Sequence, residues 1–217
     1  MTIKDMERAV GGLSRPSKMP GFAYGLSADD CIVGSLLRKV GRSKGIPTSC
    51  GTCYAKKGMY VFPNVKRAHE NRAKTMENLS QWTTNMIVLL RTKYRNKKGK
   101  DRVFRWHDSG DVQSMEHISA IMAIAEELSD IKFWVPTQEK EMFSEWLAAG
   151  NIMPKNVVVR LSAAIIGKTR KTVPGLLAST INTGNGFACK APKQGGECKN
   201  CRACWNPEIP SIDYKKH

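Results

Sequence analysis

Cysteine is the residue whose type and spacing in this chain point most directly to chemistry, because its thiolate is a strong metal ligand. Four of the seven cysteines form a C-terminal group: Cys189, then Cys198, Cys201 and Cys204 at intervals of three. Thiols at i, i+3 and i+6 let one loop turn each sulfur toward the same centre, as in bacterial ferredoxin loops. These four residues predict a closed metal site.

The metal at this closed site has two candidates. Structural zinc also takes four thiolates, but its sites are tetrahedral and are commonly built from two Cys-x2-Cys knuckles. The second knuckle is missing here, and three evenly spaced thiols are more typical of iron–sulfur sites. The sequence therefore favours a [4Fe–4S] cluster, with zinc as the alternative.

An N-terminal group combines a close pair, Cys50 and Cys53, with the more distant Cys31. Three thiolates on a cuboidal cluster leave one iron open to water, to substrate, or to a side chain such as His107 or Asp108. A second cluster is therefore expected here. Two other interpretations stay open: a zinc site completed by His107, and a buried Cys31 beside a pair that helps to bind one shared metal.

The redox state of the compartment in which the protein resides affects how its cysteines are interpreted. No run of about 18 or more apolar residues occurs, and the first residues lack the apolar core of a secretory signal. We therefore expect a cytoplasmic protein that makes no membrane contact. In a reducing compartment cysteines serve as thiolate ligands rather than as disulfides, and an odd count fits disulfide pairing poorly.

The charge of the chain is strongly positive, with 35 Lys and Arg against 19 Asp and Glu and a formal net charge of +16. A nucleic acid is the expected partner, because its phosphates are neutralised by such side chains. The alternative is a basic surface that only favours solubility, with cations attracted to a helix C-terminus. The strongest candidate for phosphate contact is the segment Arg91–Arg105, whose cations are Arg91, Lys93, Arg95, Lys97, Lys98, Lys100, Arg102 and Arg105.

Hydrophobic periodicity in the middle of the chain predicts alternating strands and helices. Helical connections between strands imply right-handed crossovers and a parallel sheet. The fold class is therefore α/β, with a small parallel sheet that could be part of a βα barrel. Two helices are expected at 64–79 and 80–95, strands at 103–107, 131–135 and 157–161, and further helices at 114–128 and 138–149.

Polar residues follow the first of these strands, where ligands of parallel sheets are usually bound. His107, Asp108 and Asp111 are the candidate catalytic residues, and Asp108 is placed to orient the ring of His107. The alternative is that they only start a loop and cap the next helix.

The chain is expected to form a single domain over residues 1–217. Its three parts are an irregular N-terminal part with the first cysteine group (1–63), the α/β core (64–184) and a cysteine-rich C-terminal segment stapled by metal (185–217).

Within the N-terminal part, residues 1–30 mix Gly, Pro and Ser and carry no sustained period, so they are expected to be irregular. A short strand or helix after Cys31 should lead into a loop from Gly41 to Ser49.

Several of these motifs together resemble the bacteriophage and prophage proteins named for gene product 88, from about Lys18 to the last residue. The resemblance implies a phage-encoded protein with cysteine-bound metal, and all seven cysteines fall in the shared motifs; the family has no settled activity. The motifs are Cys31-Ile-Val-Gly-Ser, Cys50-Gly-Thr-Cys53-Tyr-Ala, Phe62-Pro-Asn-Val, Phe104-Arg-Trp-His-Asp-Ser-Gly-Asp111, Phe133-Trp-Val-Pro-Thr-Gln138, Val159-Arg-Leu-Ser162 and Cys198-x2-Cys201-x2-Cys204-Trp205.

A weaker similarity is to radical S-adenosylmethionine enzymes, which combine a three-cysteine open cluster, a partial βα barrel and often a second C-terminal cluster. In those enzymes the three thiols lie within one short loop. Here Cys31 lies nineteen residues before Cys50, so the chain departs from their pattern.

The function expected from the sequence is that of a phage-encoded iron–sulfur protein with a basic surface. Its open cluster would do redox or radical-type chemistry on or near nucleic acid. The alternative is a zinc-stabilised nucleic-acid-binding protein with no catalytic activity. The sequence has no Walker loop, dinucleotide fingerprint or nucleophile elbow, so common nucleotide and hydrolase chemistry is not indicated.

Overall fold

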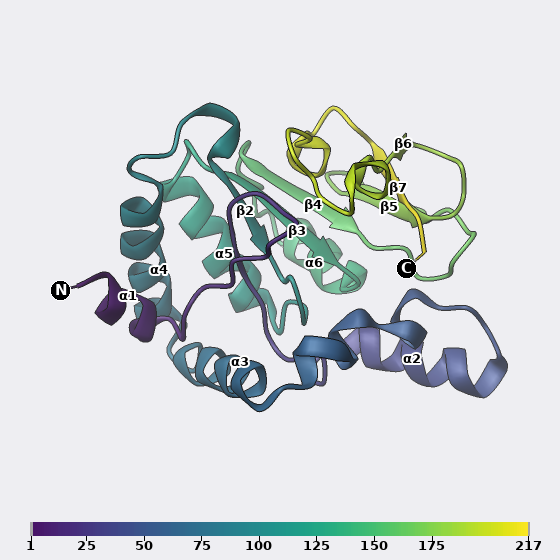
Figure 1. The fold of residues 1–217 in the computed structure, drawn as a ribbon, viewed down its shortest axis with the longest axis horizontal. Helices are drawn as coiled ribbons and strands as arrows, with labels where there is room; N and C mark the ends of the chain where they lie inside the picture. The colour runs from purple at the N-terminus through teal and green to yellow at the C-terminus, as the bar shows by residue number, and fades with distance from the viewer. Residues whose placement is uncertain (1, 217) are drawn as a thin grey trace.

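The computed structural model describes residues 2–216, which contain one sheet of seven parallel strands. The strand order across the sheet is β1-β2-β3-β4-β5-β7-β6. Figure 1 shows the ribbon coloured along the chain. The strands are β1 (Phe22–Tyr24), β2 (Val103–Trp106), β3 (Lys132–Thr137), β4 (Val157–Leu161), β5 (Leu177–Ile181), β6 (Phe187–Ala188) and β7 (Ser211–Tyr214).

Six α-helices and several short 3-10 turns occur in the same residues. None of these helices is both long enough and apolar enough to span a membrane. The helices are α1 (Ile3–Ala9), α2 (Ile32–Lys44), α3 (Pro63–Thr75), α4 (Leu79–Tyr94), α5 (Met115–Glu127) and α6 (Lys140–Ala148).

The α/β class and the parallel sheet predicted from periodicity are confirmed. Each predicted helix and strand of the middle of the chain is present within a few residues of its expected bounds, from α3 to β4. The strand order follows the chain from β1 to β5 without a reversal, so successive crossovers move in one direction, which is typical of βα barrels. The described strands leave the sheet open, with β1 and β6 at its edges.

The two faces of the sheet are covered differently. Because side chains alternate along a strand, Phe104 and Trp106 of β2 point to one face and pack, fully buried, in the core with α4 and α5. Val103 points to the other face, where it joins Trp134 of β3 and Trp205 from the C-terminal segment in a second, smaller cluster. Helices α4, α5 and α6 therefore cover one face, and the C-terminal segment with Trp205 packs on the other (Figure 1).

The prediction that residues 1–30 are irregular is wrong in two places. Thr2 and Asp5 form a capping box that starts α1, and β1 adds a strand that pairs in parallel with β2. Both elements are short, with seven and three residues. Periodicity is not visible over such lengths, so pairing with β2, about eighty residues away, decides the conformation of β1.

The predicted loop from Gly41 to Ser49 begins later than expected, because α2 continues to Lys44 and ends at the left-handed Gly45. Gly41 lies inside the helix because of packing: a Cβ there would lie 2.5 Å from Oγ1 of Thr48. The glycine allows the chain after α2 to return close to the helix.

The C-terminal segment also contains more regular structure than expected. Strand β7 pairs with β5 on one side and with β6 on the other, so the segment extends the sheet. Arg160 in β4 fastens the chain that leads into β7. Its guanidinium is fully buried and donates hydrogen bonds to five carbonyl oxygens, those of Ala178, Ala203, Cys204, Asn206 and Ile209, at 2.8–3.4 Å.

We predict that Arg160→Met lowers the free energy of unfolding by about 3 kcal/mol, because buried carbonyl groups lose a charged donor. Arg160→Lys should have an intermediate effect, since an ammonium group offers fewer donors. Urea denaturation measures both. The control is Arg91→Met, at a side chain that is 60% exposed, which should change stability by less than about 0.5 kcal/mol. Equal effects at the two positions would contradict this role of Arg160.

Candidate metal centre

The first cysteine group is assembled from segments on both sides of α2. Cys31 is the N-cap of α2, whereas Cys50 lies in the 3-10 turn Ser49–Thr52 and Cys53 ends that turn. Thr48 binds this turn to α2 through a 3.0 Å hydrogen bond from Oγ1 to the Leu37 carbonyl oxygen. The amide of Ser49 donates to the Ala164 carbonyl oxygen, beyond the end of β4. The turn is thus held between α2 and the carboxyl edge of the sheet.

Gly34, in the first turns of α2, shows how close the cysteines come. A Cβ at this position would lie 3.6 Å from Sγ of Cys31 and 3.6 Å from Sγ of Cys50. The two sulfur atoms are therefore at most twice that distance apart, and both border the space that the missing side chain leaves. The nineteen residues between these cysteines in the sequence are closed into a loop by α2 and its return.

The surroundings of Cys31 and Cys50 favour the neutral thiol over the thiolate. Burial raises the pKa of Cys31, and the charges of Asp111, Cys50 and Cys53 raise it further. Burial also raises the pKa of Cys50, to about 11, against hydrogen bonds from Ser49 that lower it. A bound cation reverses this balance by stabilising the thiolates, so metal binding at this site should release protons.

Asp111 is the predicted strand-end residue that the fold brings to the first cysteine group, as its effect on the Cys31 thiol indicates. Its carboxylate accepts hydrogen bonds from Thr137 Oγ1 at 2.6 Å and from the Gln138 amide at 2.7 Å. Burial raises the pKa of Asp111 to about 7, although these hydrogen bonds lower it. The side chain is fixed at the carboxyl edge of β2 and β3.

Two further residues near this group were not predicted from the sequence. Glu139 accepts a 2.9 Å hydrogen bond from the Val33 amide and so holds the first turn of α2 against the end of β3. Arg170 donates to the Ser162 carbonyl oxygen at 2.8 Å and to the side chain of Gln138. The sequence offered one signal for Glu139, because this acidic residue directly follows the motif that ends at Gln138. It offered no signal for Arg170.

His107 takes a different direction from Asp111. Its φ of +55° breaks the alternation of β2, and its buried ring lies 5.4 Å from the ring of His117 and 6.3 Å from that of Trp106. Neither ring nitrogen has a hydrogen-bond partner among the described residues. Burial keeps the pKa of His107 well below its usual value. The ring is a neutral member of the aromatic core, on the helix-covered face of the sheet.

Asp108 supports the segment that carries Cys53. Its backbone carbonyl oxygen accepts hydrogen bonds from the hydroxyl groups of Tyr54, at 2.6 Å, and Tyr60, at 3.4 Å. Its carboxylate is buried, and Oδ1 has no hydrogen-bond partner among the described residues. Such an orphaned acceptor is a group that a bound donor, water or cation would satisfy.

The second cysteine group lies around β7. The Cys189 amide donates to the Asp213 carbonyl oxygen at 2.9 Å, and Sγ of Cys204 lies 3.3 Å from the Tyr214 hydroxyl oxygen. Burial raises the pKa of Cys198, with Cys189 and Cys201 adding to the effect, and it raises that of Cys204 to about 11. Cys189 and Cys201 thus lie near Cys198, and Cys198 lies near Cys204. A metal site shared by the four thiols stays a prediction.

Arg105 lies between the two cysteine groups, on the face of the sheet that the helices do not cover. Its guanidinium donates to the Tyr54 hydroxyl at 3.1 Å, and Tyr54 follows Cys53 directly. It also stacks 4.7 Å above the ring of Trp134, which in turn lies 5.4 Å from that of Trp205, next to Cys204. One half-buried positive charge thus borders both groups.

All seven cysteines are free thiols. Across residues 2–216, no three or more side chains of His, Cys, Asp or Glu converge closely enough to hold a single metal ion.

The buried imidazole beside His107 provides a test of this arrangement. Burial lowers the pKa of His117 from 6.5 to about 3, so the unfolded chain takes up a proton near pH 6.5 that the folded chain excludes. The stability from this neutral ring is present above pH 6.5 and is lost as the pH falls, by about 2 kcal/mol over two pH units. We predict that His117→Asn, which keeps an acceptor for the Gln113 amide, reduces this loss. Urea denaturation midpoints from pH 7 to about 4.5 measure this loss of stability. The same dependence on pH in the variant and in the unchanged protein would contradict the prediction.

Comparison with known proteins agrees with the resemblance found in the sequence. A family model described as Gene product 88 matches residues 18–207, a span that includes all seven cysteines and the strand-end residues His107, Asp108 and Asp111. Neither the curated proteins nor the solved structures gave a match. The comparisons thus lend no support to the similarity with radical S-adenosylmethionine enzymes. The match over most of its length shows that the chain belongs to the gene product 88 family of bacteriophage proteins.

Proposed function

We propose that this protein binds iron–sulfur clusters at two sites: a closed site with four cysteines, and an open site with three. The observation that carries the proposal is the place of Gly34, around which Cys31 and Cys50 meet although nineteen residues separate them in the sequence. A distant cysteine is brought to the Cys50–Cys53 turn, and the residue between them has no side chain. The open site comprises Cys31, Cys50 and Cys53, and the closed site Cys189, Cys198, Cys201 and Cys204.

The spacing of the thiols along the chain supports a cluster over zinc. A single zinc ion holds its four sulfur ligands about 4 Å apart, as a tetrahedron with Zn–S bonds of about 2.3 Å requires. A cuboidal cluster places each thiolate on a different iron atom, so its ring of sulfurs is wider. The upper limit on the separation of the Cys31 and Cys50 sulfurs admits both groups, and the run of thiols at i, i+3 and i+6 in the closed site is more typical of the cluster.

Two carboxylates, those of Asp111 and Glu139, lie around the open site, where we propose a cluster that exchanges electrons or binds a ligand. A [4Fe–4S] cluster with three thiolates would supply electron transfer and one iron with a free coordination position. Asp111 presents a carboxylate fixed by Thr137 and Gln138, and Glu139 fixes the first turn of α2 that begins at Cys31. These residues position the site, and the carboxylate of Asp111 is the candidate to orient a substrate there.

Nucleic acid is the proposed partner, supported by the formal charge of +16. The segment Arg91–Arg105 has fewer available cations than its composition suggests, because several are engaged within the chain. Arg91 pairs with Glu127, Lys93 with Glu7, and Arg102 with Asp130, while Arg105 lies between the cysteine groups. Within the described residues, Arg95, Lys97 and Lys98 form no ion pair in the structure.

We predict that the protein, purified without oxygen, is brown and contains iron and acid-labile sulfide in equal amounts, about four of each for every cluster. Elemental analysis for iron and zinc, with a colorimetric sulfide assay, measures this. A colourless protein that contains zinc and no iron would overturn the proposal and leave the alternative, a zinc-stabilised nucleic-acid-binding protein without catalytic activity.

We further predict that Gly34→Val removes about half of the iron, because the new side chain fills the space beside Cys31 and Cys50 of one of the two sites. Ser35→Val is the matched control, since it adds a β-branched residue to the next position of α2, outside that space. Cys31→Ala should lower iron as Gly34→Val does.

Circular dichroism of each variant separates loss of iron from loss of the fold. If Gly34→Val and Cys31→Ala both fold and keep the iron content of the unchanged protein, Cys31 is not a ligand and the open site is wrongly placed.

A further inference from the structure

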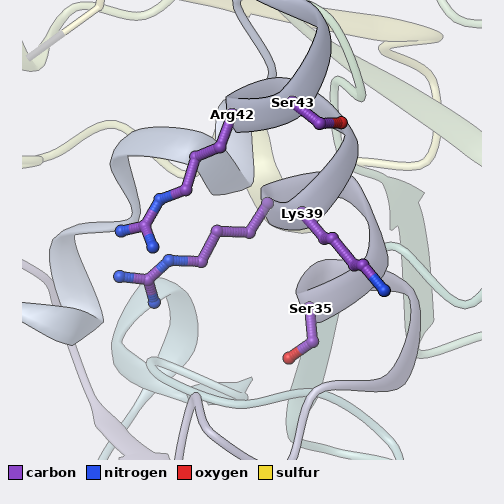
Figure 2. A pocket seen from close by; sticks show the side chains of 5 residues that line it. Ser35, Lys39, Arg42 and Ser43 are labelled. Atoms are coloured by element: carbon purple, nitrogen blue, oxygen red, sulfur yellow. The ribbon is translucent and has the colours of Figure 1, made fainter.

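Helix α2 has two faces of opposite character. Its inner face carries the two buried glycines, Gly34 beside the first cysteine group and Gly41 beside Thr48. Positions three and four apart lie on one side of a helix, so Arg38, four residues from Gly34 and three from Gly41, borders the inner face. Ser35, Arg38, Lys39, Arg42 and Ser43 line an open hollow of about 490 Å³ that extends from this border to the outer face. Figure 2 shows Arg42 and Lys39 projecting from this part of the helix in different directions.

The cations of this hollow are not committed to partners within the chain. Arg38, Lys39 and Arg42 form no ion pair with the residues that the structure describes. Nε of Arg38 is buried and also has no hydrogen-bond acceptor there. A buried charged donor without an acceptor is costly, so the hollow favours an anionic ligand.

The basic surface extends from α2 toward α3. Asp29 is paired with Lys56, and the positive charges of Arg38 and Lys66 also lower its pKa, which places both near this carboxylate. Lys66 is exposed in the second turn of α3. Four or more cations, with one carboxylate that is already paired among them, form a strip that suits a chain of phosphates.

Large apolar side chains lie exposed on α2 and on the turns that lead into α3. On α2, Ile32 and Leu36 are 54% and 60% exposed. Phe62, the N-cap of α3, is 53% exposed, and Tyr54 is 48% exposed with its hydroxyl fixed to the Asp108 carbonyl oxygen. Aromatic rings held at the surface beside cations are the features that bind single-stranded nucleic acid, because the rings stack on unpaired bases. A duplex hides the faces of its bases and offers nothing to such rings.

We propose that the outer face of α2, continued by Lys66 and the rings of Tyr54 and Phe62, binds single-stranded nucleic acid. Its phosphates occupy the hollow of Arg38, Lys39 and Arg42, and its bases stack on the rings. The inference rests on the proposed function only for the class of partner. Since the inner face of the same helix borders Cys31 and Cys50, the strand lies within about one helix diameter, roughly 10 Å, of the open cluster site.

The test is fluorescence anisotropy of a labelled oligodeoxythymidine of about twenty nucleotides, a length that exceeds usual single-strand sites. The variant Lys39→Glu/Arg42→Glu should bind it at least about 10-fold more weakly, with a salt slope smaller by about 1.5. The matched control is Lys97→Glu/Lys98→Glu, which changes the charge equally on the other basic segment and should weaken binding less than about 3-fold.

Phe62→Ala tests the stacking role separately from charge. It should weaken single-strand binding by about 5-fold or more and leave the salt slope unchanged, because stacking releases no counterions. A duplex of equal length should bind more weakly than the single strand and should not respond to Phe62→Ala.

Three outcomes would overturn the inference: tighter binding of the duplex, an equal loss in the Lys97/Lys98 control, or no oligonucleotide binding at low salt. If the protein binds no oligonucleotide at low salt but binds vesicles that contain phosphatidylserine, this face would be assigned to a lipid surface instead. Iron and sulfide are measured on the same samples. Full iron without strand binding overturns this inference alone, whereas strand binding without iron overturns the cluster proposal alone.

Discussion

The contacts of Arg105 with Tyr54 and Trp134 are the interactions on which the arrangement of both cysteine groups depends. A strand residue of a parallel sheet points to one face only, and Arg105 points to the face without helices. There its guanidinium joins Tyr54, beside Cys53, to the stack of Trp134 and Trp205, beside Cys204. A half-buried cation at this position offsets the negative charge that thiolates bring, and its charge partly opposes the burial that raises the pKa of Cys198 and Cys204.

The sheet makes this position available because its helices cover a single face. With strands ordered along the chain, successive crossovers remain on one side, and the opposite side is covered by the segment that precedes β7. Arg160 fixes that segment through backbone carbonyls rather than through side chains. The end of the second cysteine group, at Cys204, is therefore held by contacts to the backbone.

Helix α2 relates the proposed chemistry to the proposed partner. Its inner face needs glycine, because a side chain there would occupy the space beside Cys31 and Cys50. Its outer face carries cations without partners in the described residues and exposed aliphatic side chains. A ligand on the outside and a cluster on the inside would be separated by the thickness of the helix alone, so binding of one could change the environment of the other.

The sequence by itself determined the α/β core, from α3 to β4, because these elements are long enough for their hydrophobic period to appear, and it determined the two cysteine groups by spacing. It missed β1, β5 and β7, whose three to five residues become strands through pairing with distant partners. Only the tertiary structure decided that Asp111 faces the cysteines while His107 turns into the core, and that Arg105 and Arg160 hold the loops. These long side chains contact residues that are far apart in the sequence, so the local sequence pattern does not predict the contacts.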